Sequence, residues 1–170
     1  MRVGLHLPEN ERVVPWAEIA DISRLAEDVG FDSLWVPDHL IYRDAAGRRT
    51  GPWESWSILS AVAAVTSRVA IAPLVLCTSF REPGLIAKMA VTVDEISEGR
   101  LILGLGSGWN EPEYTAFGFP FESRFGRFKE SFTIISTLLR EVTSISPVAT
   151  INCASVKSDL EDHVRVASLC

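Results

Sequence analysis

The segment that decides the fold is residues 69–105, which read VAIAPLVLCTSFREPGLIAKMAVTVDEISEGRLILGL. It begins with an apolar, β-rich run and ends with another at 101–105. Between the two runs, Pro83 opens a stretch in which apolar residues recur at helical spacing, and Gly99 stands where a helix would end. A strand, a helix and a strand in this order predict a βαβ unit, in which the two strands are parallel.

The same pattern recurs along most of the chain. Apolar runs are found at 3–7, 33–36, 69–76 and 101–105, and a stretch of helical period follows each of them. Successive runs begin 30 to 36 residues apart, which is the length that a strand, a helix and two loops require. We therefore predict an α/β fold of four βα units with parallel strands, the fourth helix running over 124–141.

The character of the sequence changes beyond residue 141. No aromatic residue occurs after Phe132 and no glycine after Gly126. We therefore divide the chain into a folded part, 1–141, and an atypical tail, 142–170. Within the tail, residues 147–154 could form a fifth strand and residues 160–169 a short helix.

Composition excludes several functional classes. Aspartate and glutamate number 22 against 16 lysines and arginines, and this net charge of -6 argues against nucleic-acid or anionic-lipid partners. No apolar run approaches the roughly 20 residues that span a bilayer, and the N-terminus lacks a signal-peptide layout. Three scattered cysteines, Cys77, Cys153 and Cys170, predict neither a disulfide framework nor a metal site. We expect a cytoplasmic protein with small-molecule partners.

The chemistry is expected where the strands end, because parallel α/β folds bind ligands at the carboxyl ends of their strands. Asp38 and His39 follow the second run. Because an imidazole gains and loses its proton near neutral pH, a histidine beside a carboxylate is a candidate for acid/base catalysis. The alternative is a capping aspartate beside a merely hydrogen-bonded histidine. Cys77 is either a small core residue or a nucleophile, and Arg81 either holds an anion or is solvated.

A glycine-rich run, 104–108, overlaps the end of the fourth apolar run. It is not the dinucleotide-binding fingerprint, because Trp109 occupies the sixth position where glycine or alanine is needed. It is not a hydrolase nucleophile elbow either, since Leu105 stands in place of the first glycine. The run instead predicts a loop whose backbone closely approaches a planar or phosphorylated ligand, with an indole beside it.

Three segments taken together resemble the luciferase-like monooxygenase family. They are 33–39 (SLWVPDH), 92–100 (TVDEISEGR) and 104–114 (GLGSGWNEPEY). Within the family the chain looks most like the oxidoreductases that use the deazaflavin coenzyme F420, with FMN as the alternative cofactor. The resemblance covers residues 2–141 and implies a (β/α)8 TIM barrel, of which this chain would be the N-terminal half.

The resemblance also implies roles for individual residues in hydride transfer between the cofactor and a small organic substrate. His39 is implied to accept the substrate hydroxyl proton. The implied cofactor-binding residues are Asp38 near the ring, Cys77, Thr78 and Ser79 in a bulge with a non-prolyl cis peptide behind one ring face, and Gly106, Ser107, Gly108, Trp109 and Asn110 lining the pocket. Trp109 stands where some dehydrogenase members carry a carboxylate, which argues against that proton donor here.

The chain is shorter than a complete TIM barrel, and this leaves alternatives to the interpretation. An eight-unit barrel needs about 250 residues, and four units are expected here. In the family, later loops hold the cofactor phosphate, so we expect weak cofactor binding, of roughly millimolar affinity. The alternatives are an FMN-dependent monooxygenase with a separate reductase, and a truncated half-barrel that is catalytically silent.

Open sheet edges lead to the first prediction. Four parallel strands that do not close a barrel leave unpaired backbone groups and an apolar inner face, so the chain is expected to self-associate. Light scattering should detect dimers or larger species. A monomer at high concentration that binds no hydrophobic dye would contradict this expectation.

Overall fold

The protein is described by a computed structural model, which covers residues 1–8, 13–43, 47, 49–145 and 152–155. Parallel strands form its centre, in two sheets of order β1-β2-β5 and β6-β7-β8. A bridge between Ile71 and Leu101 joins the two sheets. The strands are β1 (Gly4–His6), β2 (Ser33–Val36), β5 (Ala70–Pro73), β6 (Leu76–Cys77), β7 (Ile102–Gly106) and β8 (Asn152–Ser155).

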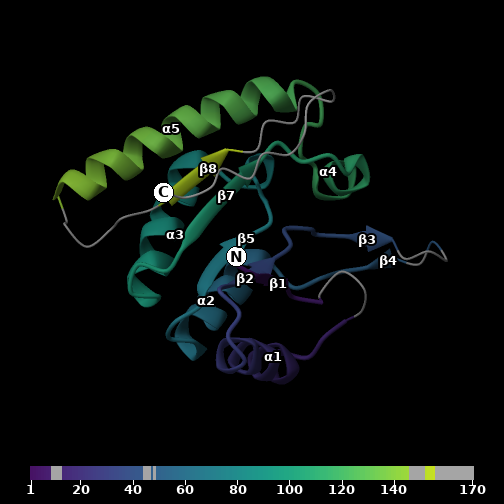
Figure 1. The fold of residues 1–170 in the computed structure, drawn as a ribbon. Coiled ribbons are helices and arrows are strands. Elements are labelled where there is room, and N and C mark those ends of the chain that lie inside the picture. The colour runs from purple at the N-terminus through teal and green to yellow at the C-terminus, as the bar shows by residue number, and fades with distance from the viewer. Residues whose placement is uncertain (9–12, 44–46, 48, 146–151, 156–170) are drawn as a thin grey trace.

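Four long helices follow one another along one side of these strands (Figure 1). They are α1 (Trp16–Asp28), α2 (Ser55–Val65), α3 (Pro83–Ile96) and α5 (Arg124–Ile145). In sequence, α1 begins after Pro15 and α3 has Pro83 in its first turn, where the missing N–H of proline costs no helical hydrogen bond. The carboxylate of Glu54 caps α2 by accepting the backbone N–H groups of Trp56 and Ser57.

The predicted parallel βα units are confirmed, with one correction in the third strand. The expected strand at 69–76 is two short strands, because β5 pairs with β2 whereas β6 pairs with β7. The chain changes partner at the Leu74–Val75 peptide, which is cis. The non-prolyl cis peptide implied for the bulge at 77–79 therefore lies just before β6 instead.

Short elements escaped the sequence patterns. They are the hairpin of β3 (Tyr42–Arg43) and β4 (Arg49–Thr50), the 3-10 turn η1 (Thr78–Phe80) and the helix α4 (Glu111–Phe117). Two-residue strands and a seven-residue helix are too short to show a hydrophobic period.

The end of the chain matches its prediction in part. A fifth strand is confirmed as β8, parallel to β7. The helix expected at 160–169 lies outside the described residues. Helix α5 runs to Ile145, four residues past its predicted end at 141, and the domain division at that point stays a prediction. No described helix is long and apolar enough to cross a membrane.

The core lies between the strands and the helices. Its fully buried side chains include Leu34, Ile71 and Leu103 from the strands, and Ile19, Leu59 and Ile86 from the helices. Burial of each such side chain contributes about 1.5–3 kcal/mol to stability. This packing fixes the strands side by side, so that the residues after their carboxyl ends are brought together.

Two charged side chains fix the opposite, amino-terminal ends of the strands. The Arg100 guanidinium donates to the carbonyls of Ala63, Thr66, Val69 and Ser97. The Glu27 carboxylate of α1 accepts the backbone N–H groups of residues 67–69 at 2.6–3.2 Å. Each therefore closes a loop that leads into or out of the core.

The pKa of Glu27 makes this second contact testable. Burial alone would raise this pKa, but the three backbone donors and the Ser67 hydroxyl lower it to about 2, from an ordinary 4.5. The stability that Glu27 contributes is therefore present above about pH 4.5 and is lost as pH falls toward 2.

Glu27→Gln is expected to lower the free energy of unfolding at pH 7 by about 1–2 kcal/mol. The difference from the parent should shrink as pH falls from about 4.5 to about 2, because the parent carboxylate is then protonated. Urea unfolding over this pH range measures it, with Asp21→Asn on the exposed face of the same helix as the control. If the difference in unfolding free energy between the parent and Glu27→Gln does not change with pH, the stabilising role of the Glu27 carboxylate is wrong.

Candidate active site

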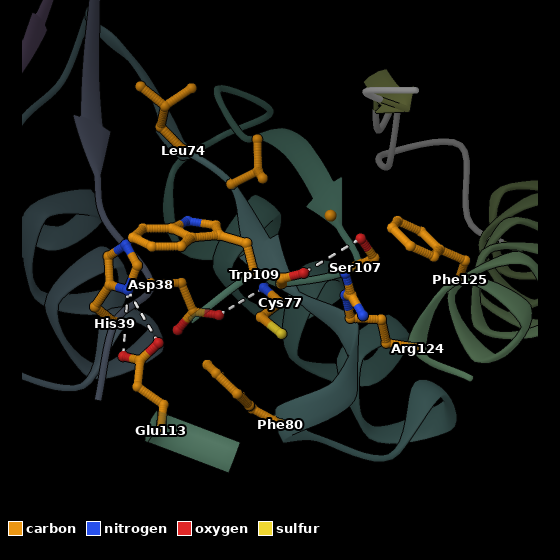
Figure 2. A pocket seen from close by; sticks show the side chains of 13 residues that line it. Asp38, His39, Leu74, Cys77, Phe80, Ser107, Trp109, Glu113, Arg124 and Phe125 are labelled. Carbon is orange, nitrogen blue, oxygen red and sulfur yellow. Dashed lines mark hydrogen bonds and ion pairs between the residues drawn. The ribbon is translucent and has the colours of Figure 1, made fainter. Parts of the chain in front are cut away.

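A pocket of about 390 Å³ opens at the carboxyl ends of β2, β6 and β7 (Figure 2). This volume is within the range of small-molecule sites. Seven predicted residues line it, namely Asp38, His39, Cys77, Gly106, Ser107, Gly108 and Trp109. Its other described lining residues are Leu74, Val75, Phe80, Glu113, Arg124 and Phe125. The structure therefore brings three strand ends together as the parallel fold requires.

Three predicted residues lie outside the pocket wall. Thr78 is buried and its hydroxyl donates to the Gly106 carbonyl at 3.3 Å. The Asn110 amide donates to the Ile41 carbonyl at 3.2 Å, and Ser79 lies in the turn η1. Among the described residues, Thr78, Ser79 and Asn110 are not part of the pocket wall.

Asp38 is fully engaged by the protein itself. Its two oxygens each accept a hydrogen bond from Arg81 at 2.8 Å, and Oδ2 also accepts the Cys77 backbone N–H at 2.7 Å. Both side chains of the ion pair are buried, at 0% and 10% exposure. Asp38 thus ties the end of β2 to β6 and the turn that follows it.

Arg81 is neither solvated nor free to hold an anion, which corrects both readings of its sequence position. It also donates to Glu54, the cap of α2, at 2.5 Å. Burial alone would lower the pKa of Arg81, but Asp38 and Glu54 raise it above its ordinary value. Burial would likewise raise the pKa of Glu54, and the bonds from Arg81 and Ser57 lower it instead. Arg81 and Glu54 therefore stay charged.

His39 is held by a carboxylate from a different strand exit. Glu113 of α4 is 2% exposed, and its two oxygens lie 3.1 and 3.2 Å from His39 Nδ1. Oε1 also accepts the backbone N–H groups of Leu40 and Ile41, at 2.6 and 3.1 Å. Sequence reasoning did not assign Glu113 to the site, although it lies within the segment 104–114 that carries part of the family resemblance.

The floor of the pocket depends on glycine and on Cys77. A Cβ at Gly108, whose φ is +74°, would collide with the Tyr114 hydroxyl and lie 2.6 Å from Cys77 Sγ. That hydroxyl also donates to the Ser107 carbonyl at 2.6 Å. Burial raises the pKa of the Cys77 thiol, which favours the core residue over the nucleophile. At this strand exit, Tyr114 and Cys77 therefore pack directly against the backbone of Gly108, where a side chain would otherwise lie.

Arg124 supplies a cation on the far side of the pocket from His39 (Figure 2). Its guanidinium lies 4.2 and 4.4 Å from the ring centroids of Phe121 and Phe125. No carboxylate among the described residues pairs with it, and its buried Nε has no hydrogen-bond partner there. An arginine in this state can bind an anionic ligand group.

Comparison with known proteins agrees with this arrangement. The model of the luciferase-like monooxygenase family matches residues 1–154, so the chain belongs to that family. The match extends beyond the resemblance over 2–141 and includes most of β8. The fold is accordingly that of a (β/α)8 TIM barrel, of which the described strands and helices form a part.

Individual relatives are similar over only part of their length. The F420-dependent glucose-6-phosphate dehydrogenase of Amycolatopsis mediterranei is 39% identical over 127 residues, covering 71% of this chain and 37% of that protein. The pyrimidine monooxygenase RutA of Methylorubrum extorquens is 40% identical over 104 residues, covering 56% and 28%. The crystal structure of the monooxygenase RslO1 from Streptomyces bottropensis matches with a TM-score of 0.66 and 27% identity, covering 79% and 42%. The chain spans less than half the length of these relatives.

The Asp38–Arg81 pair gives a stability prediction. Arg81→Met should lower the free energy of unfolding by about 3 kcal/mol, because it leaves Asp38 buried without its counter-ion. Adding Asp38→Asn should recover part of that loss, since the unpaired charge is then removed.

Urea unfolding of the two single variants and the double variant measures this coupling. The control is Arg24→Met, because within the described part of the chain Arg24 forms just an exposed ion pair with Asp21, worth about 0.5 kcal/mol or less. Additive losses in the double variant would show that Asp38 does not depend on Arg81.

Proposed function

We propose that the pocket holds the ring of coenzyme F420, or alternatively FMN, and that the protein is an oxidoreductase in which His39 takes the proton of a small organic substrate. The observation that carries this proposal is the state of His39, which Glu113 holds by one ring nitrogen while the ring lines the pocket. A relative at 39% identity is named as F420-dependent, which supports the cofactor. Because the chain spans 37% of that relative, the activity of the whole protein is part of the proposal.

The walls suit a planar conjugated ring. Leu74 and Trp109 are 48% and 67% exposed at the pocket, and Gly106 and Gly108 present backbone without side chains. Apolar walls and a bare backbone allow a flat ring to approach closely, and such a ring stacks well on aromatic surfaces. A bound flavin or deazaflavin supplies the hydride chemistry, for which the protein has no side chain of its own.

The polar groups divide between the two sides of the pocket. His39 and Glu113 lie on one side, and Arg124 lies on the other (Figure 2). We assign Arg124 to an anionic part of the cofactor or substrate, because a guanidinium binds phosphate or carboxylate through paired hydrogen bonds. Asp38 has both oxygens engaged, so we assign it to positioning the strand end beside the ring and not to direct capture of a ligand.

His39 would act as general base toward a substrate hydroxyl. A neutral imidazole accepts a proton on its free ring nitrogen, and burial to 17% exposure limits competition from water. Trp109 packs edge-on against His39, with ring centroids 5.7 Å apart. At this position the base therefore has an indole beside it and no carboxyl group, which favours a small organic alcohol over a substrate that needs a second proton donor there.

The runner-up function is an FMN-dependent monooxygenase. Both RutA and RslO1 are named as monooxygenases, and the same pocket could bind the FMN ring. Cofactor preference separates the two functions, since F420 and FMN differ in both ring and tail. If the chain binds neither cofactor, the remaining alternative is a half-barrel that is catalytically silent.

Arg124→Gln is expected to weaken FMN binding about tenfold or more, because it removes a charge-assisted contact to the phosphate. Riboflavin lacks that phosphate, so its affinity should change little in the same variant. Fluorescence titration of F420, FMN and riboflavin measures both effects, at whatever absolute affinity the chain has.

The matched control is Arg140→Gln, an exposed arginine on the same helix. Equal weakening of FMN and riboflavin by Arg124→Gln would refute the anion assignment. If no cofactor binds at all, the proposed function fails for this chain. Where turnover is measurable, His39→Ala should lower alcohol oxidation more than it weakens cofactor binding.

A further inference from the structure

Glu113 is a buried carboxylate of the pocket wall, and its hydrogen bonds within the described part of the chain all go to one short segment. It contacts His39, Leu40 and Ile41, which follow β2 after Asp38. Asn110, three residues earlier, donates to the Ile41 carbonyl. The first residues of α4 therefore bind the segment that follows β2, which is 72 to 74 residues away in sequence from Glu113.

The charge of Glu113 follows from these donors. Burial would raise its pKa, but the contacts of His39 and the two backbone N–H groups lower it below the ordinary value. An ionised carboxylate only accepts hydrogen bonds. Any neutral imidazole beside it must therefore offer a proton from the nearer ring nitrogen.

We propose that Glu113 is a positioning residue that holds neutral His39 in the tautomer with the proton on Nδ1, so that Nε2 carries the free lone pair. This inference rests on the proposed role of His39 as base, and it explains which nitrogen performs that role. In Figure 2 the second ring nitrogen points away from Glu113. The substrate hydroxyl proton would pass to Nε2 while the carbon hydride passes to the oxidised flavin or deazaflavin.

The ring is also held against rotation. Tyr42 and Trp109 both pack edge-on against the imidazole, with centroids 5.1 and 5.7 Å from it. A ring flip would break the contact to Glu113 and leave a buried carboxylate oxygen without a donor, which is costly. The aromatic neighbours and the carboxylate thus fix the same orientation.

The variant Glu113→Gln distinguishes this role from simple packing, because glutamine has nearly the same shape. In the parent, Oε1 accepts both backbone N–H groups, so the amide oxygen of the variant must take that place. The amide NH₂ then faces Nδ1 and donates to it. Nδ1 must become an acceptor, and the proton moves to Nε2, where the base is needed.

The test is the ¹⁵N spectrum of the three histidines in the full chain at a pH where they are neutral. His39→Gln identifies the His39 signals by their loss. The parent is expected to show Nδ1 protonated and Nε2 unprotonated, and Glu113→Gln is expected to reverse the two. Glu111→Gln is the matched control, since Glu111 is an exposed carboxylate on the same helix, and should leave the spectrum of His39 unchanged.

A parent chain with His39 protonated on Nε2 overturns the proposal, whether or not the variant folds. An unchanged tautomer in folded Glu113→Gln also overturns it. Neither reading needs a cofactor, so failure here is distinct from failure of the proposed function. If the parent shows the Nδ1 proton but no flavin or deazaflavin binds, the positioning role stands and the proposed function falls.

Discussion

The buried ion pair of Asp38 and Arg81 is the interaction on which the pocket depends. It joins the end of β2 to the segment after β6, and through Glu54 it reaches the first turn of α2. Asp38 also binds the Cys77 backbone, so the strand that changes partner at the Leu74–Val75 peptide is held at its new position. Without Arg81, the Asp38 carboxylate would be buried beside the pocket without its counter-ion.

Because the strands pair in parallel, the residues around the Asp38–Arg81 pair meet at one pocket. Strands β2, β6 and β7 end on the same side, so Asp38, Cys77 and Gly106 converge although they are distant in sequence. Glu113 and Asn110 then bind back to residues 39–41 from the next strand exit. The apolar and aromatic walls complete a pocket with a histidine on one side and an arginine on the other.

Sequence patterns predicted the fold and part of the site for definite reasons. Strand and helix periods, with Pro83 and Gly99 as boundaries, indicate βα units because burial requires those periods. The convergence of His39, Cys77 and Trp109 follows from the rule that parallel strands present their carboxyl ends together. The strand break at Leu74–Val75 could not be read, because it depends on which neighbour each half pairs with. Glu113 and Arg124 were missed as site residues for a similar reason, since their partners are set by tertiary packing and not by local spacing.

A flavin-type ring is proposed to occupy the pocket beside His39 and Trp109. The chain has five tryptophans, whose indole N–H signals can be followed separately in a ¹H–¹⁵N spectrum. Adding FMN or F420 should shift the Trp109 indole, which lines the pocket, and leave those of Trp16 and Trp53 in place, because neither belongs to the pocket wall. Shifts at Trp16 or Trp53 with none at Trp109 would contradict the account.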